Sequence, residues 1–197
     1  MFARTERLLL RPSWPEDSRV LYEAVADEAI VRNLAFAPWP YTPRDASEFA
    51  ALEHPARYPN FLLWQRTHGA PRLVGSCGIG NRDGAAELGY WIARPYWGLG
   101  YASEAARAVV EIAKAIGHRH LISGHFTDNP ASGRVLRKVG FCATGRTEMR
   151  HSSGRGHAVP CALFERALGD DGLNDKGDMP TRPMSVVMPY DAELIAA

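Results

Sequence analysis

AELGYWIARPYWGLGYASEAA, residues 86–106, is the stretch around which the rest of the chain is organised. Residues 88–93 have the aromatic and β-branched content of a strand, and Pro95 ends that strand. From Ala102 to Ile116 small and apolar residues recur at helical spacing, and Gly117 is suited to end the helix. The stretch therefore predicts a strand, a short turn and a helix in direct succession.

The turn between the predicted strand and helix contains Gly98 and Gly100. Glycine lets the backbone approach a ligand closely, and the first N–H groups of a helix lack intrahelical acceptors. Together with the positive end of the helix dipole, these amides form a site for a phosphate. Glycine at a tight turn also has a purely geometric use, so the turn alone leaves both interpretations open. A dinucleotide fingerprint is excluded, because residues 120–125 hold no acid that could bind a ribose.

The composition of the chain narrows its class. With 197 residues, 46% of them hydrophobic, the chain can bury one core. A net charge of +1 gives no electrostatic case for nucleic acid or an anionic membrane, so a phosphate site must be local. Cys77, Cys142 and Cys161 are widely spaced and predict buried thiols rather than disulfides or a metal site. No apolar run has the length of a signal peptide or membrane span, so a cytoplasmic location is expected.

Strands and helices are predicted in a fixed order. Helix boundaries are clearest at Asn129 and Pro130, which suit the N-cap and first position, and at Thr42 and Pro43, which repeat that pattern. The predicted strands are residues 7–11, 61–66, 73–79, 86–93, 121–126, 141–149 and 158–166, the last two around a glycine-rich loop at 152–156. The predicted helices are residues 15–26, 43–54, 102–116 and 130–139.

Two further segments differ from this pattern. The proline-rich loop at residues 33–42 carries Phe36, Trp39 and Tyr41, which we expect either to plug the end of the core or to form a substrate wall. Residues 169–197 shift to a composition typical of disorder, although SVVM at 185–188 could add a strand. We therefore expect one domain over residues 1–168 and a tail or packing arm over 169–197. Such an arm would pack on its own subunit or, in a homodimer, on its neighbour.

Three segments in the right order resemble one family. They are TERLLLRP from Thr5, ELGYWIARPYWGLGYASEA from Glu87 and NPASGRVLRKVGF from Asn129. They are similar to the GNAT superfamily of acetyl-CoA-dependent N-acetyltransferases, specifically its RimJ/RimL-like branch, and fix the element order over residues 5–167. The resemblance implies an α/β (α+β) GNAT fold. This fold has a central mixed, mostly antiparallel sheet of about seven strands flanked by helices, with a strand, turn and helix that bind a pyrophosphate.

The resemblance also implies acetyl-CoA as co-substrate, with no metal. In that family the backbone amides of the glycine turn bind the CoA pyrophosphate, and the asparagine at 129 contacts the pantetheine. Arg94 and Arg137 offer further charge, although Arg134 and Arg137 also suit a solvated helix face. The implied cofactor-binding residues are Ile92, Ala93, Trp97, Gly98, Leu99, Gly100, Tyr101, Ala102, Asn129, Ser132, Arg134 and Lys138.

An amine must lose a proton before it can attack a thioester, so a base is required. Glu87 is our candidate, because it leads into the phosphate turn and shares a strand face with Gly89 and Trp91. It could act through a water, whereas the alternative is an edge charge at the start of a strand. The histidines at 118, 120 and 125 are rival bases, but strand-end histidines are more typical of the surface.

The departing thiolate needs a proton donor. The family's frequent tyrosine falls at Leu136 here, so that position is vacant. Ser132 matches the serine of RimJ/RimL-like sequences and is the candidate for this role, directly or through a water. By resemblance, a backbone N–H near Ile92 would stabilise the oxyanion.

These expectations describe an enzyme that moves acetyl from acetyl-CoA to a primary amine by direct attack in a ternary complex. The branch implies a protein N-terminal α-amine, of the ribosomal-protein type, as acceptor. A small-molecule amine, such as an amino acid, polyamine or aminoglycoside, is the alternative, and a CoA-binding sensor without chemistry is a second one. The residues expected to line the acceptor site are Phe36, Trp39, Tyr41 and Tyr90.

Overall fold

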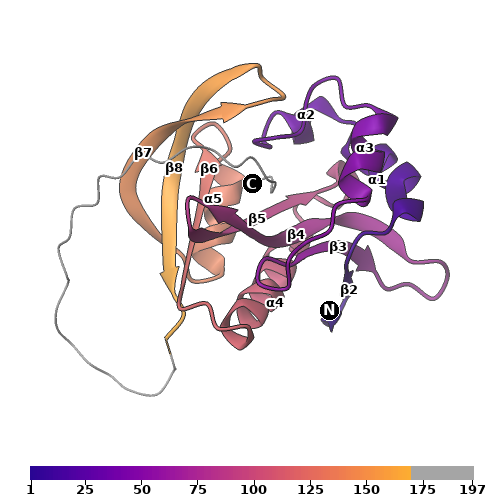
Figure 1. The fold of residues 1–197 in the computed structure, drawn as a ribbon, viewed down its shortest axis with the longest axis horizontal. Coiled ribbons are helices and arrows are strands. Elements are labelled where there is room, and N and C mark those ends of the chain that lie inside the picture. Colours follow the sequence, from indigo (N-terminus) through magenta and orange to yellow (C-terminus); the bar gives the residue numbers. More distant parts are fainter. Residues whose placement is uncertain (170–197) are drawn as a thin grey trace.

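An eight-stranded sheet forms the centre of the computed structural model, which describes residues 1–169 (Figure 1). The strands are β1 (Ala3–Arg4), β2 (Leu8–Arg11), β3 (Asn60–Gln65), β4 (Arg72–Arg82), β5 (Ala85–Ile92), β6 (His120–Phe126), β7 (Cys142–Ser152) and β8 (His157–Ala167). The helices are α1 (Ser18–Val25), α2 (Glu28–Val31), α3 (Pro43–Ala50), α4 (Tyr101–Ala115) and α5 (Pro130–Lys138), with 3-10 turns η1 (Pro15–Asp17) and η2 (Arg94–Tyr96).

The strand order is β1-β2-β3-β4-β5-β6-β8-β7. All neighbouring strands are antiparallel except β5 and β6, which run parallel and pair at Glu87 and Ile122. The predicted mixed, mostly antiparallel sheet is confirmed, and its eighth strand is the two-residue β1. The predicted arm beyond Gly169, with its SVVM segment, lies outside the described residues.

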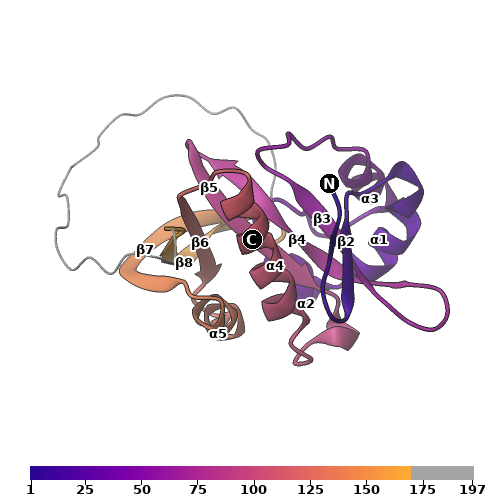
Figure 2. The same ribbon diagram turned by 90° about the horizontal axis from the view of Figure 1, so that it is seen from below.

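Helices cover both faces of the sheet (Figures 1 and 2). On one face, α4 and α5 contribute Val109 and Leu136 to a buried cluster with the strands. On the other, α1, α2 and α3 form a second buried cluster that includes Trp91 of β5. Alternate residues of a strand point to opposite faces, so Tyr90 and Ile92 pack with the first cluster. Strand β5 therefore presents side chains to both halves of the molecule.

The predicted helix over residues 15–26 is divided in two. Asp17 accepts two hydrogen bonds of 2.7 Å from Arg11 and one of 2.8 Å from the N–H of Trp14, which stabilise the turn η1 ahead of α1. The four-residue helix α2 was not predicted, because it is too short to show a periodic pattern. Helix α3 begins at the predicted Pro43 but ends four residues earlier than expected.

The turn between β7 and β8 is fastened to the loop that follows α2, as Figure 1 shows at the end of the hairpin. The N–H of Ser153 donates to the carbonyl of Ala35 at 2.8 Å, and the hydroxyl of Ser152 donates to that of Leu34 at 3.0 Å. The predicted glycine-rich loop at 152–156 thus packs against the loop after α2, on the face of the sheet that α1 to α3 cover.

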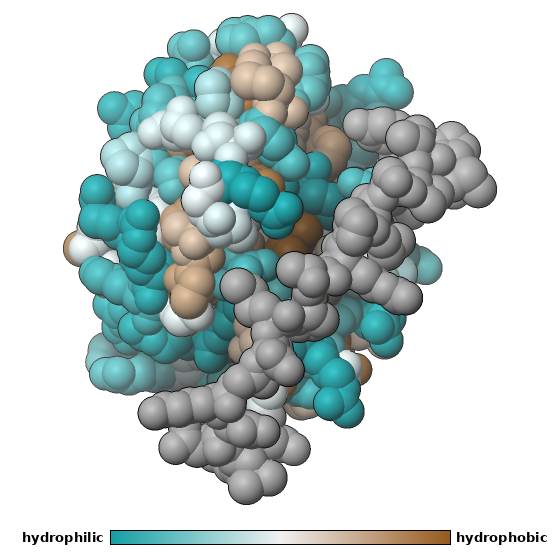
Figure 3. Space-filling view, turned by 90° about the vertical axis from the view of Figure 1, so that its left-hand side faces the viewer, coloured by the Kyte–Doolittle hydropathy of each residue, from teal (hydrophilic) through white to brown (hydrophobic). Residues whose placement is uncertain are grey.

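The edge strand β7 is exposed along most of its length, and the face on this side is mainly hydrophilic (Figure 3). Cys142, at its first position, is exposed, so the prediction of three buried thiols is wrong there, whereas Cys77 and Cys161 are buried. None of the helices within residues 1–169 combines the length and apolarity needed to cross a membrane.

Candidate active site

The turn before α4 has the geometry of an anion site. Gly98 and Gly100 have φ angles of +76° and +84°, in the left-handed region that favours glycine. Gly100 is the N-cap of α4 and supplies no side-chain acceptor, so the first N–H groups of the helix are not capped. A Cβ at Gly98 would have no atom within 4 Å, so the space beside the turn is open. Open space beside uncapped helical N–H groups is the arrangement that binds anions at helix N-termini.

Arg7, between β1 and β2, fastens the N-terminal strands to this turn. Its guanidinium donates to the carbonyl of Leu99 at 2.9 Å and pairs with Glu104 of α4 at 2.7 Å. The Glu104 carboxylate also accepts from the backbone N–H of Arg7 at 2.9 Å and the hydroxyl of Thr5 at 2.6 Å. Burial alone would raise the pKa of Glu104, but these hydrogen bonds outweigh it and hold that pKa below its usual value. Arg7 was not predicted as a site residue, although it lies in the TERLLLRP segment.

Strands β5 and β6 diverge beyond their single pair, which opens a gap in the sheet. The N–H of Ala93 donates to Val74 of β4 at 2.9 Å. Because backbone groups alternate along an antiparallel ladder, those of Ile92 face the other way, toward the gap. The carbonyl of Ile92 accepts a hydrogen bond of 2.6 Å from the indole of Trp97. The N–H predicted to stabilise the oxyanion therefore faces this gap.

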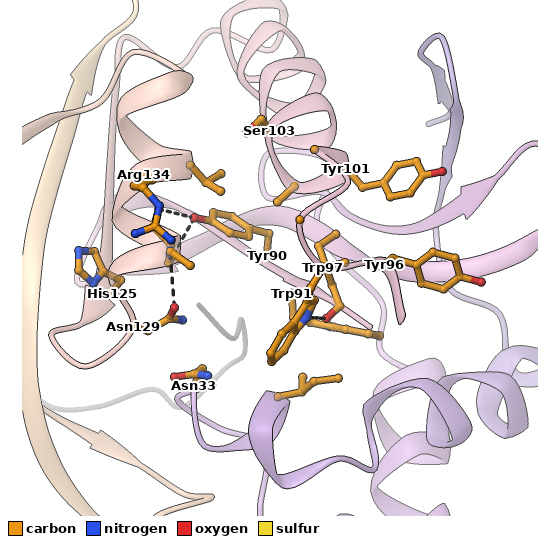
Figure 4. A pocket seen from close by; sticks show the side chains of 18 of the residues that line it. Asn33, Tyr90, Trp91, Tyr96, Trp97, Tyr101, Ser103, His125, Asn129 and Arg134 are labelled. Carbon is orange, nitrogen blue, oxygen red and sulfur yellow. Dashed lines mark hydrogen bonds between the residues drawn. The ribbon is translucent and has the colours of Figure 1, made fainter. Parts of the chain in front are cut away.

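A cleft of about 370 Å³ follows the gap (Figure 4). Its walls come from β5, the turn before α4, the end of β6 and α5. Ala93 and Leu99, both predicted to bind cofactor, do not line the cleft, because Ala93 packs in the second cluster and the Leu99 side chain is exposed. The other predicted cofactor-binding residues line it, namely Ile92, Trp97, Gly98, Gly100, Tyr101, Ala102, Asn129, Ser132, Arg134 and Lys138.

Positive charge enters the cleft from α5. Arg134 and Lys138 are four residues apart, so they lie on one helix face, and both line the cleft. The other two arginines considered from sequence are engaged elsewhere. Arg137 lies over an aromatic ring of β8, 5.3 Å from its centroid, and Arg94 pairs with Asp27 at 3.2 Å.

Tyr90 and Ser132 form a pair of hydroxyl groups in the cleft (Figure 4). The Tyr90 oxygen lies 2.7 Å from the Ser132 hydroxyl and 3.1 Å from the Ser132 carbonyl. Burial raises the pKa of Tyr90, and the hydrogen bond to Ser132 only partly opposes that shift, so the phenol stays protonated at neutral pH. The phenol has one proton, so when that proton points to the serine hydroxyl oxygen rather than to the serine carbonyl, the serine proton is free to point into the cleft. Leu136 is fully buried in the core and does not line the cleft.

Glu87 is buried and bound by two arginines. Its Oε1 accepts from Arg150 of β7 at 2.5 Å and its Oε2 from Arg82 at 2.6 Å. Burial lowers the pKa of Arg150, but the charge of Glu87, together with the hydrogen bonds to Glu87 and Glu148, outweighs this and raises that pKa overall. Glu87 does not line the cleft, so the structure gives it an ion-pair role that the sequence did not indicate. As a base it would have to release an arginine, and Arg82, whose side chain is 27% exposed against 9% for Arg150, is the easier to displace.

A second cavity of about 440 Å³ adjoins the cleft. Leu34 and Trp91 line both spaces. Of the aromatic residues predicted to line the acceptor site, Phe36 and Tyr41 line this second cavity. Trp39 lines neither space and is 42% exposed.

Several residues that sequence reasoning did not assign also line the cleft, and two of them are Asn33 and His125. Asn33 comes from the loop after α2, and His125, expected at the surface, comes from the end of β6. The Nδ1 of His125 lies 2.8 Å from a backbone carbonyl, which can only accept, so Nδ1 donates and a neutral ring offers Nε2 as acceptor. The ring packs so closely on Gly133 that a Cβ there would lie 2.5 Å from Nε2. The signal that places His125 on the face covered by α5 is the period of two along β6, because Leu121, four residues earlier, packs with Leu136 of α5.

Comparison with known proteins agrees with this geometry. Residues 7–142 match the family model described as Acetyltransferase (GNAT) domain. The chain is 29% identical over 148 residues to the uncharacterized N-acetyltransferase YoaA of Bacillus subtilis strain 168, covering 72% of this chain and 82% of that protein. A GNAT-family acetyltransferase from Bacillus anthracis is 25% identical, with a TM-score of 0.72, over 85% of this chain and 98% of that one.

RimL, a ribosomal L7/L12 α-N-protein acetyltransferase solved in complex with CoA, has a TM-score of 0.68 at 17% identity, over 85% of this chain and 98% of that one. The chain belongs to the GNAT family of acetyltransferases, because the family model spans most of its length. The predicted GNAT fold and enzyme class are confirmed. RimL is one of several structural neighbours, so the RimJ/RimL-like branch stays a prediction.

Proposed function

We propose that this chain transfers acetyl from acetyl-CoA to a primary amine by direct attack in a ternary complex. The observation that carries the proposal is the continuity of the cleft. It joins the uncapped start of α4, the gap between β5 and β6, and the hydroxyl pair of Tyr90 and Ser132. An anion site, an open strand edge and a proton donor thus occur along one path, as a long phosphorylated thioester requires.

The residues present fit acetyl-CoA, which supplies the acetyl group as an activated thioester when bound. The open space beside Gly98 and the uncapped amides that follow it would hold the pyrophosphate. Arg134 and Lys138 would contribute charge to the phosphates. Asn129 caps α5 by accepting from the N–H of Ser132 at 3.4 Å and also lines the cleft, where it would contact the pantetheine.

The hydroxyl pair of Tyr90 and Ser132 would protonate the departing thiolate. Ser132 would donate its proton to the departing thiolate and regain one from water, while Tyr90 stays protonated and hydrogen-bonds the serine oxygen. The N–H of Ile92, which faces the gap, donates to the oxyanion as it develops. We propose Glu87 as the base, acting through a water after Arg82 is displaced.

For the acceptor we propose a protein N-terminal α-amine. Support comes from the three segments that resemble the RimJ/RimL-like branch and from the fold shared with RimL. A small-molecule amine is the second candidate, and the second cavity favours it because its size suits the body of a small ligand. We also propose that residues 1–168 form the acetyltransferase domain.

The decisive experiment measures thiol release from acetyl-CoA with a panel of peptides and small amines, followed by mass spectrometry of the acceptor. Turnover with a peptide acetylated at its N-terminus supports the protein acceptor. Turnover with small amines alone replaces it by the second candidate. Tight CoA binding without turnover of any acceptor would contradict the catalytic proposal and favour a sensor.

A further inference from the structure

The second cavity is a largely apolar recess of about 440 Å³ that is open to solvent, because Phe36 and Glu48 in its wall are exposed. It opens within the second core cluster, and the apolar residues Leu21, Val25, Phe49 and Trp91 form much of its wall. A concave apolar space of this size is typical of a ligand subsite.

The wall of this cavity is held in place by contacts that are distant in sequence. Ser153 lines it, and its N–H bonds to the carbonyl of Ala35 at 2.8 Å. In the same turn, Arg155 pairs with Asp128 through two hydrogen bonds of 2.8 and 2.9 Å and donates to the carbonyl of Arg32 at 2.6 Å. The recess is therefore formed before any ligand binds, which lowers the entropic cost of binding.

Asp45 of α3 gives the cavity a negative rim, whereas the charge of Glu48, which also lines it, is offset by an ion pair with Arg44. Asp45 accepts from the N–H of Thr42 at 2.7 Å through Oδ2, and Glu48 accepts from Arg44 at 2.7 Å through Oε1. Burial, with the charge of Asp45 beside it, raises the pKa of Tyr41 above its ordinary value, so its hydroxyl is a neutral donor there. Such a rim favours a cationic ligand such as an alkylammonium ion and disfavours an anionic one.

We infer that this cavity binds the apolar group carried beside the acceptor's amine, so that the enzyme selects primary amines with a large apolar substituent and rejects acidic ones. The inference rests on the proposed acetyl transfer. Leu34 and Trp91 line both spaces, so an acceptor seated in the cavity extends past them into the cleft that holds Ser132. For a protein N-terminus, the first residue is then phenylalanine, leucine or methionine rather than serine or aspartate.

A binding experiment tests the inference without relying on turnover. Phenethylamine and ethanolamine, which differ in the apolar group, are titrated by calorimetry into the full chain saturated with CoA. We expect phenethylamine to bind at least about tenfold more tightly. Such a ratio corresponds to about 1.4 kcal/mol of binding free energy, and burial of an aromatic group contributes more than that. Equal affinities, or no measurable binding of either amine, would overturn the inference.

A matched pair of variants locates the selectivity. Ala37 is half-buried and lines the cavity, so Ala37→Leu should fill part of it and abolish the tenfold preference. Ala24 is also half-buried but faces a separate recess beside α1, so Ala24→Leu should keep the preference. A preference that survives Ala37→Leu in a folded protein would overturn the inference. If Ala37→Leu does not fold, the inference is still tested by the wild-type titrations and by the peptides described in the next paragraph.

Peptides that differ only in their first residue separate this inference from the proposed function. With phenylalanine, leucine, serine or aspartate first, we expect kcat/KM to be at least about tenfold higher for the two apolar residues, with aspartate lowest. Turnover that does not depend on the first residue would overturn the inference and leave acetyl transfer intact. Selective binding of phenethylamine without turnover of any amine would overturn acetyl transfer and support the inference about the cavity.

Discussion

The cleft and the second cavity lie side by side but are built in different ways. The cleft is formed mainly by β5, α4, β6 and α5, which follow one another in the chain between residues 85 and 138. The cavity is assembled from α1, the loop after α2, α3 and the β7–β8 turn, which are far apart in sequence. A site built from consecutive elements leaves local motifs, whereas one built from distant segments does not.

Glu87 is the proposed base and does not line either space, and its substitution should have the largest effect. If Glu87 is the base, Glu87→Gln should lower kcat by about a hundredfold or more while CoA affinity stays unchanged, because the amide cannot accept the proton. Steady-state kinetics and CoA titration check this. A normal kcat with a lower Tm would instead show that Glu87 is not the base and that it only stabilises the fold through its ion pairs with Arg82 and Arg150.

Ser132→Ala tests the chemistry assigned to the cleft alone. We expect kcat to fall by about tenfold to a hundredfold, because the leaving thiolate loses its proton donor, while KM for acetyl-CoA changes little. Tyr90→Phe should lower kcat by less, because Ser132 keeps its own hydroxyl. Ser47→Ala, on the exposed side of α3, is the matched control. Unchanged kcat in Ser132→Ala would exclude the serine as donor.

Arg7→Met tests whether a residue far from the cleft in sequence controls it. The variant removes the hydrogen bond to Leu99 and the pair with Glu104, so we expect KM for acetyl-CoA to rise about tenfold with kcat unchanged. Arg19→Met, an exposed substitution on α1, is the control. A fall in kcat without a change in KM would contradict a role in holding the phosphate turn.

The same contact predicts an acid dependence. Because the folded state lowers the pKa of Glu104, its contribution to stability is complete above the ordinary value of 4.5 and is lost as pH falls through the lowered value. Tm measured from neutral pH down to pH 3 should therefore decline less steeply below about 4.5 in Glu104→Gln than in the wild type. Parallel curves for the two proteins would show that Glu104 makes no such contribution.

The smallest effects are expected for two aromatic residues of one loop, Phe36 and Trp39, which should differ from each other in their effect on kcat/KM. Phe36 lines the second cavity and Trp39 does not. Phe36→Ala should lower kcat/KM for apolar acceptors by about threefold to tenfold, and Trp39→Ala by less than about twofold. Equal losses would extend the acceptor site to Trp39, as the sequence suggested.

Prediction from sequence succeeded where a local pattern has a local physical cause. Gly98 and Gly100 mark the turn before α4 because only glycine adopts their backbone angles easily, and Asn129 marks the start of α5 because its side chain caps that helix. Each of these reasons can be read within a few residues of the position itself.

Prediction failed where the cause lies across the chain. Nothing near Glu87 indicates that Arg150, 63 residues later, would pair with it. Similarly, Arg7 contacts Glu104 at a separation of 97 residues. The four-residue α2 and the second cavity were missed for the same reason, since both depend on packing between segments that no periodic pattern connects.

The contact of Arg7 with the turn before α4 also links cofactor binding to the stability of the first strands. A ligand that binds only the folded turn stabilises that turn by mass action. Because Arg7 hydrogen-bonds to the turn and lies between β1 and β2, these two strands should be stabilised as well. Backbone amides of these strands should therefore exchange with deuterium more slowly when CoA is bound. By the reciprocity of linked equilibria, opening of the first strands should weaken CoA binding by the same factor by which bound CoA disfavours that opening.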